Sequence, residues 1–197
     1  MDHHQLLQKL VTTRNYSSYL EIARGGDDRA RDLQCSYKVV IDSIAGGTLR
    51  LDSTTYFAQL QADVRFDLIF IDGYHHCLEV NRELEAAFKH LAVGGTIVLH
   101  DCNPPTEVIG SYPQHPNTIA WCGDVWRTVA LWRTRSDVTL VTLPQDWGCA
   151  ILQKGVNRNP YTLPVALVEW YQLPWTTFEQ ERSTLLNLCG EDEVVRV

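Results

Sequence analysis

The fold is decided by the stretch Phe66-Asp67-Leu68-Ile69-Phe70-Ile71-Asp72 and by the residues that follow it as far as Asp101. This first run is almost continuously apolar, which is typical of a strand buried on both faces of a sheet. Apolar side chains recur at helical spacing from Cys77 to Leu91, and Thr96-Ile97-Val98-Leu99-His100-Asp101 is a second apolar run. Because two strands joined through a helix pair in parallel, the stretch predicts a βαβ unit.

Further elements are expected on both sides of this unit. Upstream, the pattern predicts a helix around 6–11, strands at 19–22, 38–42 and 48–51, a short helix starting at Asp27-Asp28, and a helix over 53–64. Downstream, it predicts an irregular stretch over 102–123, a helix over 124–132, antiparallel strands at 138–141 and 149–152, and a helix over 176–188. The sum is an α/β fold, a three-layer Rossmann-like sandwich with a mainly parallel sheet and an antiparallel final hairpin. We expect one domain over 1–155 and a Pro-rich C-terminal extension over 156–197, packed on that domain or on a second subunit.

The composition is typical of a globular protein and excludes several classes of function. Of the 197 residues, 45% are hydrophobic and 21% are charged, and the formal net charge is −7. No run of Lys or Arg forms a basic stripe, so neither nucleic acid nor an anionic membrane surface is expected as a partner. The N-terminus lacks a signal-peptide pattern and no segment reaches ~18 apolar residues, which favours a cytoplasmic protein. The six cysteines contain no C-x-x-C pair and are expected to be reduced thiols.

Acidic residues recur at the ends of the predicted strands. Glu21, Asp42, Asp72 and Asp101 stand at or near the ends of four strands, and Asp52 follows a fifth. Acidic residues are depleted in β-strands, so their repetition at these positions is informative. In open α/β sheets, ligands bind at the carboxyl ends of the strands. Any one of these acids is more simply explained as a solvated strand end or a helix cap. Together they predict a ligand site at this edge of the sheet.

The turn after the first predicted strand resembles a nucleotide-binding loop. Glu21-Ile22-Ala23-Arg24-Gly25-Gly26 would lead from the strand into a helix, but it lacks the G-x-G-x-x-G fingerprint. Asp42 follows at the end of the next strand, at about the 20-residue spacing at which an acid accepts the ribose hydroxyls of a dinucleotide. The loop and the acid together fit either NAD or S-adenosylmethionine.

Three stretches of the chain resemble class I S-adenosylmethionine-dependent methyltransferases. They are 19–26, then 66–76, which contains the motif I-D-G-x-H, and 94–101, which ends in H-D. The sequence is most similar to a small bacterial branch of this family, which in turn is similar to the metal-dependent O-methyltransferases. The resemblance covers most of 16–154. It implies a seven-stranded sheet whose last hairpin is antiparallel.

The resemblance also implies which residues bind S-adenosylmethionine. Ala23 stands where the family's loop usually has its first glycine, and its methyl group would narrow the approach of the backbone to the methionine moiety. Asp42 would bind the ribose, while Asp72 and Gly73 would lie beside the cofactor. The methionine end would be lined by Glu21, Ala23 and Gly25, and the adenine by Asp52 and Ser53.

In the metal-dependent members of the family, acids at the ends of the fourth and fifth strands bind a divalent cation. The matching residues here are Asp72 and Asp101, with His100 or Asn103 as a further ligand. Carboxylates suit Mg²⁺, whereas two histidine ligands would suit Zn²⁺, Mn²⁺ or Fe²⁺. Such a cation lowers the pKa of a substrate hydroxyl and orients it. His75 is the candidate general base beside the catalytic acids Asp72 and Asp101, although it could instead be a helix-start histidine bonded to backbone.

Three functions from different classes are open at this point. The first is an O-methyltransferase that acts on a small hydroxylated molecule such as a sugar, a glycoside or a natural product. The second is a metal-dependent hydrolase in which Asp72, His75, His100 and Asp101 activate water. The third is a non-catalytic binding module that keeps the fold. A nicotinamide oxidoreductase is disfavoured because the glycine fingerprint is missing. The expected partner is a small molecule, and the aromatic residues of the tail could also support a homodimer.

Overall fold

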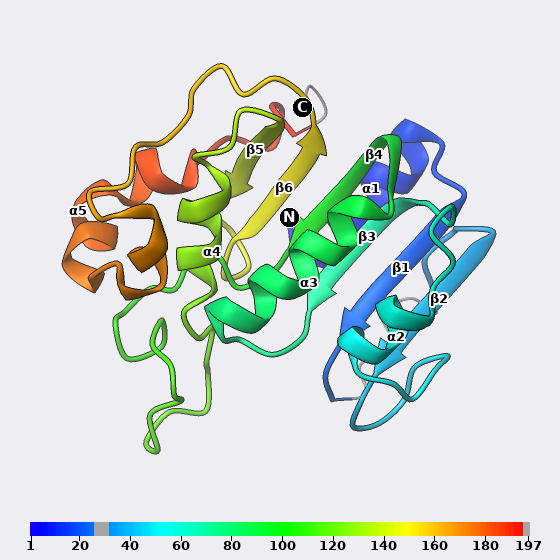
Figure 1. Cartoon of the computed structure of the whole chain (residues 1–197), viewed down its shortest axis with the longest axis horizontal. Coiled ribbons are helices and arrows are strands. Elements are labelled where there is room, and N and C mark those ends of the chain that lie inside the picture. Colours follow the sequence, from blue (N-terminus) through cyan, green and yellow to red (C-terminus); the bar gives the residue numbers. More distant parts are fainter. Residues whose placement is uncertain (26–31, 195–197) are drawn as a thin grey trace.

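A six-stranded sheet forms the centre of the molecule (Figure 1). The structure is a computed structural model, and it describes residues 1–25 and 32–194. The strands follow the order β2-β1-β3-β4-β6-β5, in which β1 to β4 are parallel and β6 runs antiparallel to both β4 and β5. The βαβ unit and the antiparallel final hairpin are thereby confirmed. The strands are β1 Ser18–Ala23, β2 Tyr37–Asp42, β3 Phe66–Asp72, β4 Leu91–Leu99, β5 Val138–Leu143 and β6 Cys149–Lys154.

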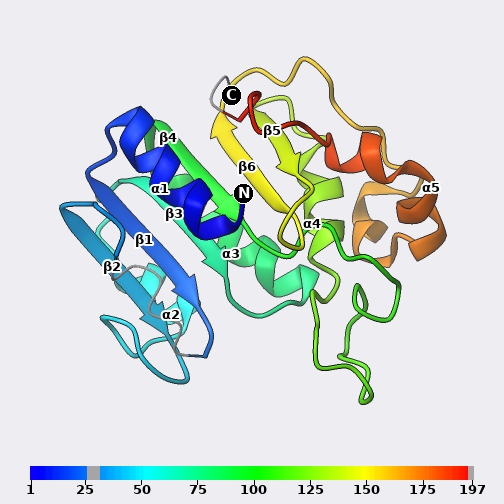
Figure 2. The same ribbon diagram turned by 180° about the vertical axis from the view of Figure 1, so that it is seen from behind.

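Helices cover both faces of the sheet, so the predicted three-layer sandwich is confirmed. α1 (His3–Arg14) lies on the face that Figure 2 shows. On the face that Figure 1 shows lie α2 (Ser53–Gln59), α3 (Cys77–Lys89) and α4 (Val125–Trp132). The 3-10 helix η2 (Leu167–Gln172) and α5 (Trp175–Leu186) both contact α4, on the side of the molecule away from β2.

β3 is buried on both faces, as its apolar run predicts. Leu68 and Phe70 pack against α1 in one hydrophobic cluster, while Ile69 and Ile71 belong to the cluster on the opposite face. All four side chains are fully buried. Because burying one such side chain contributes roughly 1.5–3 kcal/mol, this strand anchors both layers of helices to the sheet.

The sheet has six strands within the described residues, not the seven that the family resemblance implies. Residues 48–51, which were expected to form a strand, make only an isolated bridge between Leu49 and Ile41. The turn at Gly46-Gly47 folds the chain back so closely that the backbone N–H of Leu49 donates to the carbonyl of Val40 at 3.0 Å. Leu49 stays 40% exposed. The pairing therefore ends after one bridge, because little apolar surface is buried by extending it.

The end of α3 also differs from its prediction. The helix ends at Lys89 and β4 begins at Leu91, so Gly94-Gly95 lies inside the strand instead of terminating the helix. Gly94 has a φ of +74°, and a Cβ on Gly95 would lie 2.8 Å from a backbone oxygen of β3. Glycine is needed there to pass close to the neighbouring strand. The short helix predicted from Asp27-Asp28 lies outside the described residues.

The C-terminal residues share the core of the rest of the chain. Phe178, Leu185 and Leu186 of α5 are fully buried in the cluster that also contains residues of α3 and α4. Thr142 of β5 forms a bridge with Leu188 just after α5. Across 1–25 and 32–194, no helix is both long and apolar enough to cross a membrane.

Candidate active site

Four polar side chains meet where β3 and β4 end. Asp72 is the last residue of β3, and His100 and Asp101 follow its parallel neighbour β4. His75 lies in the turn after β3, and its Nε2 is 3.1 Å from Asp101 Oδ2 and 3.5 Å from Asp72 Oδ1. His100 Nδ1 is 3.2 Å from Asp72 Oδ1. The structure thus brings together the four residues that the sequence singles out at this edge of the sheet.

A strained turn holds Asp101 in this group. Its φ is 60°, in the left-handed region that few non-glycine residues adopt. The next residue, Cys102, donates its backbone N–H to the carbonyl of Gly148 at 3.0 Å. A Cβ on Gly148 would lie 2.4 Å from the Cβ of Asn103, so glycine is needed for the two turns to pack. Strain of this kind costs on the order of 1–3 kcal/mol and recurs at functional sites.

His75 is held in place by the irregular stretch 102–123, which extends beyond the carboxyl ends of the strands (Figure 1). Its Nδ1 donates a hydrogen bond to the carbonyl of Trp121 at 2.8 Å. Its own carbonyl accepts the backbone N–H of Asp124 at 3.2 Å. A Cβ on Gly123 would lie 1.7 Å from that carbonyl oxygen, so this approach requires glycine. The ring is therefore oriented by backbone groups from a remote part of the chain.

The electrostatic surroundings of His75 favour its charged form. Burial by itself lowers the pKa of His75, but the hydrogen bond with Asp72 and the charge of Asp101 outweigh burial and raise it. Because Nδ1 is occupied as a donor to a carbonyl, Nε2 is the nitrogen that can take up a proton. That nitrogen faces the two carboxylates.

His100 is engaged through both ring nitrogens. Nδ1 donates toward Asp72 at 3.2 Å, and Nε2 donates to the backbone carbonyl of Asp146 at 2.9 Å. A ring that donates from both nitrogens is an imidazolium. Burial lowers the pKa of His100, but the hydrogen bond and charge of Asp72, with those of Asp101 and Asp146, raise it to about 9. In this arrangement His100 neutralises carboxylates and has no lone pair to offer to a metal.

The N-terminal helix completes the network behind His100. His3 Nδ1 hydrogen-bonds the carboxylate of Asp146, and the backbone N–H of His3 donates to the same carboxylate at 2.7 Å. The His3 ring stacks on Phe70 of β3 with 5.7 Å between the ring centroids. Sequence reasoning missed His3 and Asp146, because only the packing of α1 on the sheet brings them to the strand-end motifs.

A cavity of about 290 Å³ opens beside these four polar side chains. Trp121 and Trp147 form part of its wall, and Arg24 closes one side. Trp121 also belongs to an aromatic cluster: the ring centroid of Tyr74 lies 6.1 Å from that of Trp121, and the hydroxyl of Tyr74 lies 2.9 Å from that of Tyr112. The irregular stretch 102–123 therefore supplies one wall of this cavity.

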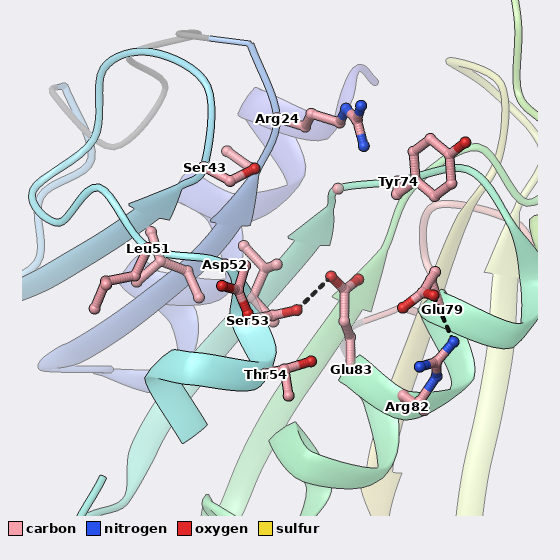
Figure 3. A pocket seen from close by; sticks show the side chains of 14 residues that line it. Arg24, Ser43, Leu51, Asp52, Ser53, Thr54, Tyr74, Glu79, Arg82 and Glu83 are labelled. Carbon is pink, nitrogen blue, oxygen red and sulfur yellow. Dashed lines mark hydrogen bonds and ion pairs between the residues drawn. The ribbon is translucent and has the colours of Figure 1, made fainter. Parts of the chain in front are cut away.

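A second pocket, of about 430 Å³, lies at the ends of β1, β2 and β3 (Figure 3). Arg24 lines this pocket as well as the smaller cavity, so the two adjoin. Figure 3 shows Arg24 and Tyr74 at one end and Ser53 at the other. Four of the residues predicted to bind the cofactor line it, namely Ala23, Asp52, Ser53 and Gly73.

The described lining of this pocket lacks the other four residues predicted to contact the cofactor, namely Glu21, Gly25, Asp42 and Asp72, of which Asp72 lines the smaller cavity. Asp42 is buried, and its carboxylate accepts the backbone N–H of Gly25 at 2.9 Å and that of Ile44 at 2.7 Å. Glu21 lies inside β1, fully buried, and accepts a hydrogen bond from the hydroxyl of Tyr19 at 2.7 Å. In the structure Asp42 therefore holds the loops that follow β1 and β2.

Glu83 of α3 lines the larger pocket and was missed by sequence reasoning. It is 8% exposed, and its Oε1 accepts a hydrogen bond from Ser53 Oγ at 2.8 Å. Its Oε2 is buried and has no hydrogen-bond partner among the described residues, and a Cβ on Gly73 would lie 3.2 Å from it. Burial raises the pKa of Glu83 to about 7 although Ser53 opposes the shift. The available signal was its helical spacing from Val80 and Ala87 on the buried face.

The donors at the strand ends fit a hard divalent cation through two carboxylates. Ligand atoms of Asp72, Asp101 and His100 lie within 4.8 Å of one another. Carboxylate oxygens suit Mg²⁺ and Mn²⁺. Asn103, the alternative ligand, is directed elsewhere, because its Oδ1 accepts a hydrogen bond from Arg182 Nη1 at 2.9 Å.

Comparison with protein families agrees with this architecture. A family model described as a methyltransferase domain matches residues 12–102. The matched range includes the four parallel strands together with Asp72, His75 and Asp101. No curated protein matches the sequence at a significant level.

Solved structures share the fold at low sequence identity. An O-methyltransferase from Bacillus cereus in complex with SAH is 20% identical, with 76% of this chain and 78% of that chain covered and a TM-score of 0.53. The O-methyltransferase TomG from Streptomyces achromogenes, in complex with SAM, is 19% identical over 77% of this chain and 78% of that chain, also with a TM-score of 0.53. The methyltransferase MycE of the mycinamycin pathway, in complex with Mg, SAH and mycinamycin VI, is 16% identical over 82% of this chain and 51% of that chain, with a TM-score of 0.52. The chain therefore has the fold of the class I S-adenosylmethionine-dependent methyltransferases and contains, over residues 12–102, the match to a methyltransferase domain that the resemblance predicts.

Proposed function

We propose that this protein is an S-adenosylmethionine-dependent O-methyltransferase that methylates a hydroxyl group of a small molecule. The observation that carries the proposal is the adjacency of two cavities with different chemistry. The larger one, of about 430 Å³, has polar groups suited to a nucleoside, and the smaller one, of about 290 Å³, holds His75 between two carboxylates. A methyl donor in the first could reach an acceptor in the second past their shared residue, Arg24.

The larger pocket contains a buried hydrogen-bond acceptor that suits the donors of S-adenosylmethionine. The buried Oε2 of Glu83 requires a donor, and the adenosyl part of the cofactor carries an amino group and two ribose hydroxyls. Ser53 fixes the other oxygen of Glu83, so the carboxylate is oriented before a ligand binds. Ile22, Ala23 and Leu51 supply apolar surface in the same pocket.

His75 is the proposed general base. His75 lines the smaller cavity, and because Nδ1 donates to the carbonyl of Trp121, Nε2 is the nitrogen that would take the proton from a hydroxyl of the acceptor. Asp72 and Asp101 stabilise the imidazolium that forms, because both carboxylates lie within 3.5 Å of Nε2. Since methyl transfer is an in-line displacement, the remaining task of the protein is to orient the two reactants.

We also propose that Asp72 and Asp101 hold a divalent cation, Mg²⁺ or Mn²⁺. When bound, such a cation lowers the pKa of the acceptor hydroxyl and neutralises its developing charge. The pair of carboxylates supports this proposal, as does the presence of Mg in the complex of MycE. His100 would then act behind Asp72 as a positioning residue.

The acceptor is expected to be small or to insert only one end. A cavity of about 290 Å³ with Trp121 and Trp147 in its wall suits a ring such as a sugar or an aromatic unit. This size and lining support a sugar, glycoside or natural-product type of acceptor. We infer that residues 156–197 form an extension packed on the catalytic domain, which is supported by the buried side chains Phe178, Leu185 and Leu186.

Titration calorimetry of the full chain with S-adenosylhomocysteine is the first test. Binding with a micromolar Kd is expected, and absence of binding at millimolar ligand would refute the methyltransferase proposal. Tight binding of Zn²⁺ or Mn²⁺ without any affinity for S-adenosylhomocysteine would favour the hydrolase alternative. Methyl transfer to a panel of sugars, glycosides and phenols would then identify the acceptor class.

A further inference from the structure

A cavity of about 540 Å³ lies at the end of the sheet opposite the active site. β6 runs antiparallel to β4, so its last residue, Lys154, reaches the start of β4 and donates a hydrogen bond to the carbonyl of Leu91 at 2.8 Å. Val138, the first residue of β5, pairs with Lys154. The cavity is built by this end of the hairpin, by residues 156–159 and by Asn187. In Figure 1 the end of β6 lies at the opposite edge of the sheet from the end of β3.

The cavity is lined by a buried arginine that lacks a counter-charge. Arg133 follows α4 and is only 1% exposed. Its Nη2 lies 3.5 Å from the carbonyl of Thr184 near the end of α5, and its Nε is buried without a hydrogen-bond partner in the described chain. None of the described carboxylates forms an ion pair with it, and burial alone lowers its pKa. An isolated buried charge is expensive, so such groups are normally paired.

Arg135 shows the usual arrangement two residues further along. Its guanidinium lies 2.9 Å from the carboxylate of Glu85 and 2.9 Å from that of Asp137. These partners raise its pKa, the hydrogen bond to Asp137 most strongly. The chain therefore has carboxylates close to this region, yet they pair with Arg135 and leave Arg133 without one.

The lining of the cavity is positive in an acidic protein. Lys154 and Arg158 line it together with Arg133, and no Asp or Glu is among its described lining residues. The whole chain has a formal net charge of −7. A pocket with cations only and little solvent around its arginine concentrates positive potential and attracts anions.

We propose that this cavity binds a small molecule bearing an oxyanion, a carboxylate or a phosphate, with the guanidinium of Arg133 as its anchor. A guanidinium can donate two parallel hydrogen bonds to either group. Leu140, Val141 and Val156 line the same cavity and offer apolar surface to the rest of the ligand. The site is separate from both cavities at the carboxyl end of the sheet, so the inference does not depend on the proposed methyl transfer.

Binding of two probes to the full chain tests this proposal. Inorganic phosphate and hexanoate are titrated into the wild type, into Arg133→Met and into Arg135→Met, with thermal unfolding as a second readout. We expect at least one probe to bind in the millimolar range and to raise Tm, and Arg133→Met to weaken that binding at least tenfold. Arg135→Met, which removes a cation outside the cavity, should keep the affinity within threefold.

The outcomes separate the site from general attraction of anions. Equal losses in Arg133→Met and Arg135→Met, or no binding of either probe to the folded wild type at tens of millimolar, would overturn the proposal. Arg133→Met is expected to fold, because an apolar side chain of similar length replaces an unpaired charge. Arg133→Lys serves as the second variant: it should retain part of the affinity for phosphate if the charge anchors the ligand. Preferential binding of phosphate or of hexanoate tells which oxyanion the site accepts.

Discussion

Buried charged side chains are paired at one end of the sheet and, within the described chain, unpaired at the other. At the carboxyl end, Asp72 and Asp101 lie beside His75 and His100, with the contacts between opposite charges at 3.1 to 3.6 Å. At the other end, Arg133 is buried without a carboxylate partner in the described chain. The first group is electrostatically balanced by its own residues and can act as a preorganised site. For the second, the proposed oxyanion ligand would supply the counter-charge.

Replacing His75, one of the four charged residues at the carboxyl end, should have the largest effect. His75→Ala removes the proposed base, and turnover should fall by roughly 10²–10⁴. His76→Ala is the matched control, because the neighbouring ring stacks on Tyr112 at 4.0 Å and lies outside the charged group. Steady-state rates with a methyl acceptor measure both variants. A loss below tenfold in His75→Ala, or equal losses in both, would show that His75 only positions other residues.

Removal of divalent cations tests whether the two carboxylates and two histidines at the carboxyl end support turnover without a metal. If Asp72 and Asp101 hold a cation, chelation should lower turnover by roughly 10²-fold, and addition of Mg²⁺ or Mn²⁺ should restore it. Affinity for S-adenosylhomocysteine should change little, since the larger pocket has its own polar groups. Full turnover in a metal-free preparation would mean that the two carboxylates serve His75 and His100 alone.

Glu83 also lies at the carboxyl end, but its charge is not balanced there. Its buried Oε2 has no hydrogen-bond partner among the described residues, and in this it resembles Arg133 at the other end. We expect Glu83→Gln to weaken binding of S-adenosylhomocysteine about tenfold, as a hydrogen bond to a charged group is typically worth about 1.5–3 kcal/mol. Glu79→Gln is the control, since Glu79 lines the same pocket but pairs with Arg82. Calorimetry measures both, and an unchanged affinity in Glu83→Gln would remove Glu83 from the binding site.

The same variant has a pH-dependent effect on stability. The folded pKa of Glu83, about 7, lies above its ordinary value of 4.5. Between these values the folded state binds more protons than the unfolded state, so stability falls as the pH rises from 4.5 to 7. A permanently neutral Gln avoids this loss, so the free energy of unfolding at pH 8 should rise by up to roughly 3 kcal/mol, with no gain below pH 4.5. Urea unfolding at both pH values checks the sign, and equal effects at the two pH values would contradict it.

The smallest expected effect concerns the aromatic cluster behind Trp121, which lines the cavity proposed for the acceptor. Tyr112→Phe removes the hydroxyl that lies 2.9 Å from that of Tyr74 and keeps the ring that stacks on His76. The loss of this hydrogen bond should loosen the cluster and raise KM for the acceptor by roughly threefold, with kcat nearly unchanged. A fall in kcat at constant KM would instead assign the hydroxyl a part in the chemistry.

The regular elements followed from local sequence, and so did much of the active site. Buried strands, the helix between them and the final hairpin are set by runs and periodicities that span few residues, as β3 illustrates. Asp72, His75 and Asp101 could be grouped in advance, because the carboxyl ends of adjacent parallel strands necessarily meet. The sequence did not indicate that residues 48–51 would fail to form the seventh strand, because their pairing depends on how much apolar surface the neighbouring edge offers.

Roles that depend on where a side chain points were not predictable. Asp42 stays the predicted ribose-binding residue, but the sequence did not indicate that its carboxylate also accepts the backbone N–H groups of Gly25 and Ile44. His100 was predicted as a metal ligand, and the sequence did not indicate that its Nε2 donates to the carbonyl of Asp146. Gly25 and Asp146 come from other loops than Asp42 and His100, and their positions are a property of the folded chain.

The sequence by itself determined the α/β class, the parallel core of the sheet and the line of acids at its carboxyl edge, because these depend on residues close in the chain. The tertiary structure alone decided which buried charged groups keep an atom without a hydrogen-bond partner among residues 1–25 and 32–194. Glu83 and Arg133 are ordinary charged residues in the sequence, and only burial between elements from distant parts of the chain removes them from water. The cost of desolvating a charge depends on everything packed around it, and for that reason these two residues, one at each end of the sheet, could be recognised only in the folded protein.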